Sequence, residues 1–231
     1  YKKLRAFLRM LKDQDKGTQK ITVSKQLKKC YRCLGDIRDL QLQQQGFRKI
    51  TWQHRIEKQT AINLLQKKIN HLKSKFLKDF TVKIIHRSVA KNKSALPSSF
   101  PLSGFRNYVA GKWHVIHGIC THDPLTDEDI HAIRKNLKDL FYNAELYRHL
   151  SLDIQIPKHL LDELGNFQDR CRTISLLDKM PGKKLALPAH IKTDWLKQKQ
   201  NSKLLLLKHI GQAIVDGDRR MEWAAGTGIL K

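Results

Sequence analysis

Long apolar runs, cysteine and proline are all scarce in this chain of 231 residues. No stretch approaches the ~18–20 consecutive apolar residues that a membrane-spanning helix needs. The four cysteines are too few for the disulfide framework of a small secreted domain, so we expect reduced thiols and a cytoplasmic protein. None of the six prolines occurs in the first 96 residues, which favours long uninterrupted helices there.

Acidic residues are also few, because 21 Asp and Glu stand against 45 Lys and Arg, for a formal net charge of +24. A charge of this size destabilises a compact fold by self-repulsion. It therefore indicates a polyanionic partner such as nucleic acid, an acidic membrane surface or a phosphate polymer. A small neutral ligand would not require it. Hydrophobic residues make up 40% of the chain, which is enough for a folded core.

The spacing of the apolar residues predicts an all-α protein. Trp52–Lys93 has a helical pattern throughout, with a break expected near Ser74 because the apolar face drifts. Ile130–Tyr147 repeats the helical pattern, and Ser103–Thr121 predicts a further helix that joins two halves of the chain. Because Tyr1 already lies in a helical pattern, we expect residues upstream of it.

Proline and small polar residues mark the segments between the predicted helices. Asn92–Pro101 is the clearest linker, and Lys179–Pro188 is a shorter one. Thr126 precedes three acidic residues and is predicted to cap a helix, because its hydroxyl can accept a hydrogen bond from a free backbone N–H.

Three short patterns recur in the same order at an offset of 128 to 130 residues. The pairs are Lys2-x-x-Arg5-x-x-x-Arg9 with His131-x-x-Arg134-x-x-x-Lys138, Leu34-Gly35-x-x-x-Asp39 with Leu164-Gly165-x-x-x-Asp169, and Ser74-Lys75 with Ser202-Lys203. An ordered repetition of this kind predicts an internal duplication. We expect two related helical bundles, residues 1–93 and 126–231, with 94–125 as a linker plus the joining helix.

The first repeated pattern predicts two cationic stripes, because residues at i, i+3 and i+7 share one helix face. One stripe is Lys2, Arg5 and Arg9, and the other is His131, Arg134 and Lys138. Facing halves would bring the stripes into one groove that focuses its field on a polyanion. Neighbouring helices could extend the lining with Lys28, Arg32, Lys75 and Lys203.

The second repeated pattern has mainly a structural interpretation. Gly35 and Gly165 would let two helices approach closely, and Asp39 and Asp169 would each orient a nearby arginine. No catalytic role is assigned to either aspartate.

Taken together, these duplicated patterns resemble those of the CHAD domain, the conserved histidine α-helical domain, with the second stripe continuing into Tyr142 and Glu145. The resemblance covers Tyr1 to about Asp216. It implies two four-helix bundles related by a pseudo-twofold axis, around a basic groove or pore that binds inorganic polyphosphate. It adds Arg38 to the binding residues, either as a direct contact or as a brace for a neighbouring aspartate, and suggests association with polyphosphate granules.

The chain departs from the family pattern in ways that argue against a metal site. Lys2 stands where a histidine is expected, so paired histidines are missing. Cys30-x-x-Cys33 and the group around His114 to His122 have metal-ligand residue types, but a structural zinc site normally shows two such pairs. We expect neither a metal nor another cofactor.

Catalysis, nucleic-acid binding and membrane binding are the remaining alternatives. The sequence has no Glu-x-Glu-x-Lys run and no Gly-x-x-x-x-Gly-Lys phosphate loop, so we expect no enzyme. Sequence-independent RNA binding is the main alternative, although aromatic residues, on which bases stack, are only 7%. A membrane surface is less favoured because the four tryptophans are dispersed. The expected function is non-catalytic polyphosphate binding.

Overall fold

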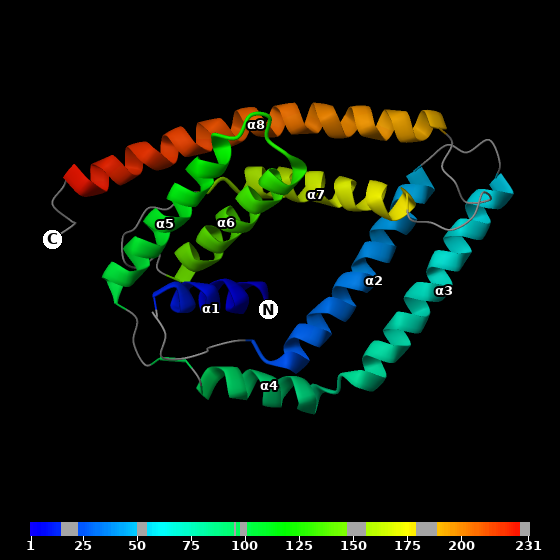
Figure 1. Cartoon of the computed structure of the whole chain (residues 1–231). Coiled ribbons are helices and arrows are strands. Elements are labelled where there is room, and N and C mark those ends of the chain that lie inside the picture. Colours follow the sequence, from blue (N-terminus) through cyan, green and yellow to red (C-terminus); the bar gives the residue numbers. More distant parts are fainter. Residues whose placement is uncertain are drawn as a thin grey trace. The chain divides into compact units, whose positions relative to one another are not determined.

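The predicted all-α class is confirmed within the residues that the computed structural model describes, which are 1–14, 23–49, 55–94, 96–97, 101–146, 156–178 and 189–226. Figure 1 shows the helices of this part of the chain, which are α1 (Lys2–Gln14), α2 (Lys25–Lys49), α3 (Arg55–Asp79), α4 (Val82–Ser94), α5 (Leu102–Cys120), α6 (Asp127–Leu146), α7 (Lys158–Asp178) and α8 (Ala189–Gly226). Over the described ranges, no helix has the length and apolar character needed to cross a membrane.

The helices group into two compact units whose segments alternate along the chain. Unit 1 comprises Tyr1–Thr22, Leu96–Phe167 and Ser202–Lys231, and unit 2 comprises Val23–Ala95 and Gln168–Asn201. Unit 1 therefore contains α1, α5 and α6, and unit 2 contains α2, α3 and α4, while α7 and α8 contribute to both.

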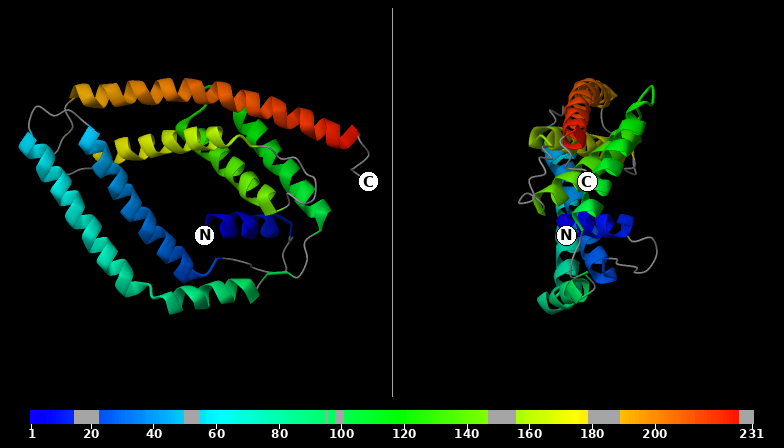
Figure 2. Two further views of the ribbon diagram at one scale, coloured as in Figure 1. Left: turned by 180° about the vertical axis from the view of Figure 1, so that it is seen from behind. Right: turned by 90° about the vertical axis from the view of Figure 1, so that its left-hand side faces the viewer.

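In unit 1, α6 packs against both α1 and α5. Figure 2 shows α5 and α6 side by side from two further directions. The apolar face of α6 that the sequence predicts is buried, as Ile133 and Leu137 show. The helices packed against it bury Phe105 and Ile116 of α5 and Met10 of α1. Burial of this face is the main stabilising contribution, because amphipathic helices gain most of their stability from packing.

In unit 2, α2 packs along α3 and also contacts α4. Phe47 of α2 and Leu65 and Ile69 of α3 are buried in this core. At Gly46 of α2, an added Cβ would be in ordinary contact with side chains of α8 and α7, 3.4 Å from Trp195 Cη2 and 3.6 Å from Thr173 Cγ2, so both helices pack next to this position.

Two predicted boundaries are wrong. The break expected near Ser74 lies instead at Phe80 and Thr81, because α3 continues to Asp79 and the Thr81 hydroxyl accepts a hydrogen bond from the Ile84 N–H (3.4 Å) where α4 begins. Drift of the apolar face does not by itself end a helix. The linker expected from Asn92 starts later, since Asn92 is a buried residue of α4 whose Oδ1 accepts the Ser24 N–H at 3.3 Å.

Two other local predictions are confirmed. The helix predicted at Ser103–Thr121 is α5, Leu102–Cys120, despite its three glycines. Thr126 caps α6, since its Oγ1 accepts the Asp129 N–H at 3.1 Å. The second predicted linker, Lys179–Pro188, lies outside the described residues.

Candidate functional site

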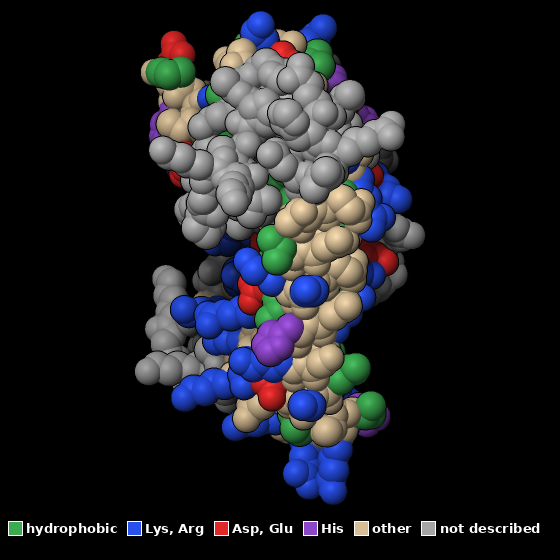
Figure 3. Space-filling view, turned by 90° about the vertical axis from the view of Figure 1, so that its right-hand side faces the viewer, with side chains coloured by type: hydrophobic (Ala, Val, Ile, Leu, Met, Phe, Trp, Pro, Cys, Tyr) green, Lys and Arg blue, Asp and Glu red, His purple; other side chains and the backbone are tan. Residues whose placement is uncertain are grey.

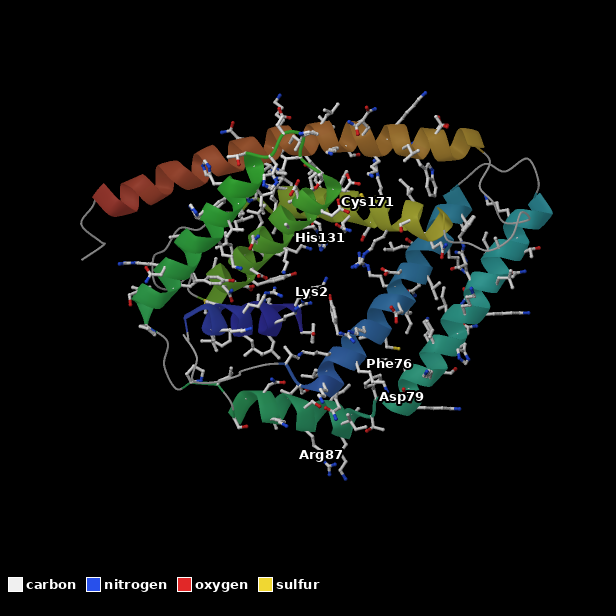
Figure 4. The ribbon with its side chains drawn as sticks, in the orientation of Figure 1. Lys2, Phe76, Asp79, Arg87, His131 and Cys171 are labelled. Atoms are coloured by element: carbon white, nitrogen blue, oxygen red, sulfur yellow. The ribbon has the colours of Figure 1, made fainter. Side chains whose placement is uncertain are left out.

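Unit 1 holds both predicted cationic stripes on helices that pack against each other, α1 and α6. On α1, Lys2 and Arg5 are exposed and Arg9 is half-buried, and exposed Lys12 extends this face by one turn. On α6, His131 is exposed, while Arg134 and Lys138 are half-buried. Figure 4 labels Lys2 near the start of α1 and His131 near the start of α6, the two positions that the repeats match.

The two helices meet at a buried polar contact, where Asn143 Nδ2 of α6 donates to the backbone oxygen of Ala6 in α1 at 3.3 Å. The same Nδ2 donates to the hydroxyl of Tyr108 in α5, also at 3.3 Å. Lys3 Nζ binds Glu145 Oε2 at 2.7 Å at the surface. These contacts fix the position of the α1 stripe relative to α6, and Asn143 was not a residue that the sequence analysis identified.

Asp139 of α6 is a second residue that sequence reasoning missed, and it is almost completely buried, with 1% of its side chain exposed. Arg9 Nε donates to its Oδ2 at 2.8 Å, and Arg9 Nη2 donates to its Oδ1. Lys112 Nζ of α5 lies 3.8 Å from Oδ2 and donates to Asn136 Oδ1 at 3.2 Å. Two cations therefore compensate one buried carboxylate, which leaves this cluster with a net positive charge.

Two further residues of the predicted site in unit 1, Arg134 and Lys203, lie next to other helices. The Arg134 guanidinium lies over Gly165 of α7, where an added Cβ would be 3.9 Å from Nη2. Lys203 Nζ of α8 lies 4.0 Å from Asp127 Oδ1, at the start of α6. Lys203 therefore contacts the start of the helix that carries the second stripe.

The start of α6 is stabilised by a reciprocal cap. The Asp129 N–H donates to the Thr126 hydroxyl. In return, Asp129 Oδ2 accepts the Thr126 backbone N–H at 2.9 Å and the Thr126 hydroxyl at 2.7 Å. The backbone hydrogen bond contributes most to lowering the pKa of Asp129, and the hydroxyl hydrogen bond adds to it. His122 Nδ1, which lies 3.1 Å from Oδ1, also lowers this pKa. The cap anchors the first turn of α6 next to His131.

The other predicted site residues, Lys28, Arg32, Arg38 and Lys75, belong to unit 2. Lys28 and Arg32 are exposed on α2, and Lys75 is exposed on α3. Arg38 Nη2 donates to Asp169 Oδ2 of α7 at 2.9 Å, so the aspartate that it contacts lies on another helix and is not a sequence neighbour in α2.

The expectation that the matched aspartates orient arginines is confirmed. While Arg38 binds Asp169, Arg172 Nη1 donates to Asp39 Oδ1 at 3.1 Å. The result is a reciprocal pair of ion pairs between α2 and α7. The expectation of close helix approach at the matched glycines is wrong, because a Cβ added at Gly35 would meet no atom within 4 Å and one at Gly165 would meet only a side chain.

The residue types that suggested metal ligands are not grouped as a metal site in the described part of the chain, where no three His, Cys, Asp or Glu side chains are placed to hold an ion. Burial raises the pKa of the Cys30 thiol, and the neighbouring Cys33 adds to the effect. Burial likewise raises the pKa of Cys120, with a contribution from Asp129. Both thiols are therefore poorer nucleophiles and poorer metal ligands at neutral pH than ordinary cysteines.

Compared with protein-family models, curated proteins and solved structures, the chain matches none of them.

Proposed function

We propose that this protein binds inorganic polyphosphate without catalysis, through the cationic residues of α1 and α6. The observation that carries the proposal is that two stripes with matching sequence spacing lie on two helices in direct contact within one compact unit. Arginine offers a planar set of donors to phosphate oxygens, and lysine offers a flexible point charge. Neutral His131 adds a donor, and its protonated form adds charge.

The buried carboxylate of Asp139 separates the residues of the α1 stripe into a positioning residue and ligand contacts. Asp139 holds Arg9 through two hydrogen bonds, so Arg9 acts mainly as a positioning residue. Arg5 and Lys12 are exposed on the same helix face and can approach phosphate oxygens without breaking a buried ion pair. The exposed cations of α1 are therefore the ligand contacts in this proposal.

The proposal includes the finer architecture that the resemblance to the CHAD domain implies. In that arrangement two duplicated bundles share a basic groove, to which α1 brings the stripe of the first repeat and α6 that of the second. Arg38, Lys28, Arg32 and Lys75 would add polyanion contacts on unit 2 itself. A cytoplasmic location, with association to polyphosphate granules, is part of the same proposal.

The direct test is the binding of labelled long-chain polyphosphate to the variant Arg5→Gln/Arg134→Gln. We expect the affinity to fall by about tenfold or more, because two phosphate contacts are removed. The control is Lys73→Gln/Lys93→Gln, which removes the same charge from exposed positions of unit 2. Since Arg134 is half-buried, thermal unfolding is followed in parallel, and Arg5→Gln/His131→Gln repeats the test with exposed positions only.

An unchanged affinity in both unit 1 variants would refute the assignment. RNA binding is separated from it by competition at physiological salt, with single-stranded RNA at equal phosphate concentration. If the polyphosphate complex persists in excess RNA, the site is selective for phosphate polymers. If RNA displaces polyphosphate at equal phosphate concentration, RNA binding becomes the favoured function. Salt dependence alone decides nothing, because counterion release accompanies every polyanion.

A further inference from the structure

A third cationic stripe runs along α3 in unit 2. Lys68, His71, Lys75 and Lys78 follow one another at i, i+3, i+7 and i+10, and all four are exposed. This spacing places them on one face of the helix. It repeats the pattern of the α1 and α6 stripes, although sequence analysis had singled out only Lys75. The stripe extends over about 15 Å of helix, at 1.5 Å per residue.

A fourth stripe lies on α4, the helix that follows. Lys83, Arg87 and Lys91 are exposed and recur every four residues, so they too share one face, about 12 Å long. The buried residues of α4 are Ser88 and Asn92, on the face that packs toward α2. Figure 4 shows Arg87 pointing away from the rest of unit 2.

Negative charge is nearly missing from these two helices. Among their described side chains, Asp79 is the one carboxylate, and its Oδ2 lies 3.4 Å from Lys29 Nζ of α2. Figure 3 shows the face of the molecule that includes α3, with Lys and Arg side chains spread over its lower part and few Asp or Glu side chains between them. Like charges placed this close repel one another, and a bound polyanion would relieve the repulsion.

The exposed side chains of the two helices favour phosphate over bases. No Phe, Tyr or Trp ring is exposed among the described residues of α3 and α4. Phe76, the aromatic residue nearest the stripe, is half-buried and packs against Phe80 with ring centroids 5.0 Å apart. Single-stranded nucleic-acid sites normally add exposed aromatic rings for stacking, and this surface offers none.

We infer that the α3 and α4 stripes together form a second polyphosphate-contact surface, which selects long chains over short ones. The inference rests on the proposed function. A short chain such as tripolyphosphate can contact only part of one stripe. A long chain that is already bound can add contacts on further stripes without a second loss of translational freedom, so its affinity rises steeply with length.

The test compares Lys78→Gln/Arg87→Gln, which removes one cation from each stripe, with Lys73→Gln/Lys93→Gln. The control removes the same charge from the same two helices, but at exposed positions off the stripes. We expect the stripe variant to lose about tenfold in affinity for long-chain polyphosphate, with its tripolyphosphate affinity unchanged. The control should lose less than about twofold for either ligand.

Equal losses in the two variants would mean that net charge alone matters, and would overturn the inference, as would no loss in either. An equal loss for single-stranded RNA would also overturn it, because the surface would then be a general polyanion contact. The proposed function fails separately. Arg5→Gln/Arg134→Gln in unit 1 should lower the affinity for tripolyphosphate as well as for long chains. An unaltered affinity of this variant would refute the proposed function without changing the result for the α3 and α4 stripes.

Discussion

Arg9 and Asp139, 130 residues apart in the chain, form a bidentate ion pair in which Arg9 Nε donates to Asp139 Oδ2 at 2.8 Å and Nη2 donates to Oδ1. The carboxylate is buried, whereas 29% of the arginine side chain is exposed. The pair joins α1 to α6, so the two helices that carry the matching stripes are held together by a member of one stripe.

We predict that Arg9→Met lowers the free energy of unfolding by about 3–5 kcal/mol, because it leaves the Asp139 carboxylate buried without its main partner. The double variant Arg9→Met/Asp139→Leu should recover most of this loss, since Lys112 keeps its hydrogen bond to Asn136. Chemical denaturation of the single and double variants measures both effects. Lys12→Met, an exposed change on the same helix, is the control, and equal stability of all three variants would contradict the prediction.

The cap at the start of α6 predicts a pH-dependent contribution to stability. The pKa of Asp129 is lowered below its ordinary value of 3.8 in the folded state, so the contribution is present at neutral pH. It is lost as the pH falls below 3.8 through the lowered pKa. Asp129→Asn should therefore destabilise the protein at neutral pH, and its difference from the wild type should shrink in acid. Thermal unfolding at both pH values checks this, and a difference that grows in acid would contradict it.

Gly165 leaves room for the Arg134 guanidinium, so substitutions there should depend on size. Gly165→Ala places a Cβ at ordinary contact distance, 3.9 Å from Nη2, and should stabilise α7 by up to about 1 kcal/mol. Gly165→Leu should displace the guanidinium and weaken polyphosphate binding. Isothermal titration of the two variants tests this, since the alanine variant supplies the matched control. Equal affinities would show that the position of Arg134 does not matter for the ligand.

The reciprocal pairs Arg38–Asp169 and Arg172–Asp39 should each contribute only about 0.2–1 kcal/mol, because their arginines are more than half exposed. A double-mutant cycle on Arg38→Gln and Asp169→Asn measures the first coupling energy. We also expect Arg38→Gln to weaken polyphosphate binding less than Arg5→Gln, because Asp169 already accepts a hydrogen bond from the Arg38 guanidinium. A larger loss than with Arg5→Gln would assign Arg38 a direct contact.

Local signals in the sequence were sufficient for several features of this protein. The lack of proline before residue 97 and the apolar spacing predicted helices, and Thr126 followed by acidic residues predicted the α6 cap. The spacing also predicted the repeated stripes and an arginine partner for each matched aspartate, but not which arginine. The helices, the cap and the stripes depend on residues within a few turns of one another, and the aspartate–arginine pairing was indicated by a pattern that occurs twice in the sequence. These predictions therefore did not require knowledge of the packing.

The boundary errors arose where packing, which the sequence pattern does not contain, decided the outcome. The apolar face drifts near Ser74, but α3 ends only where the Thr81 hydroxyl can cap the next helix. Asn92 is a polar residue next to small and basic ones, which is typical of a linker, yet a hydrogen bond from Ser24 holds it buried in α4.

The sequence by itself determined the helical class, the excess of positive charge and the spacing that puts cations on single helix faces, because these follow from composition and from the 3.6-residue period. Tertiary structure alone decided which cations are restrained. Nothing local distinguishes Asp139 from any other aspartate, and only the packing of α1 and α5 on α6 buries it and recruits Arg9 and Lys112. A buried charge needs a partner, and that partner comes from wherever the fold supplies it.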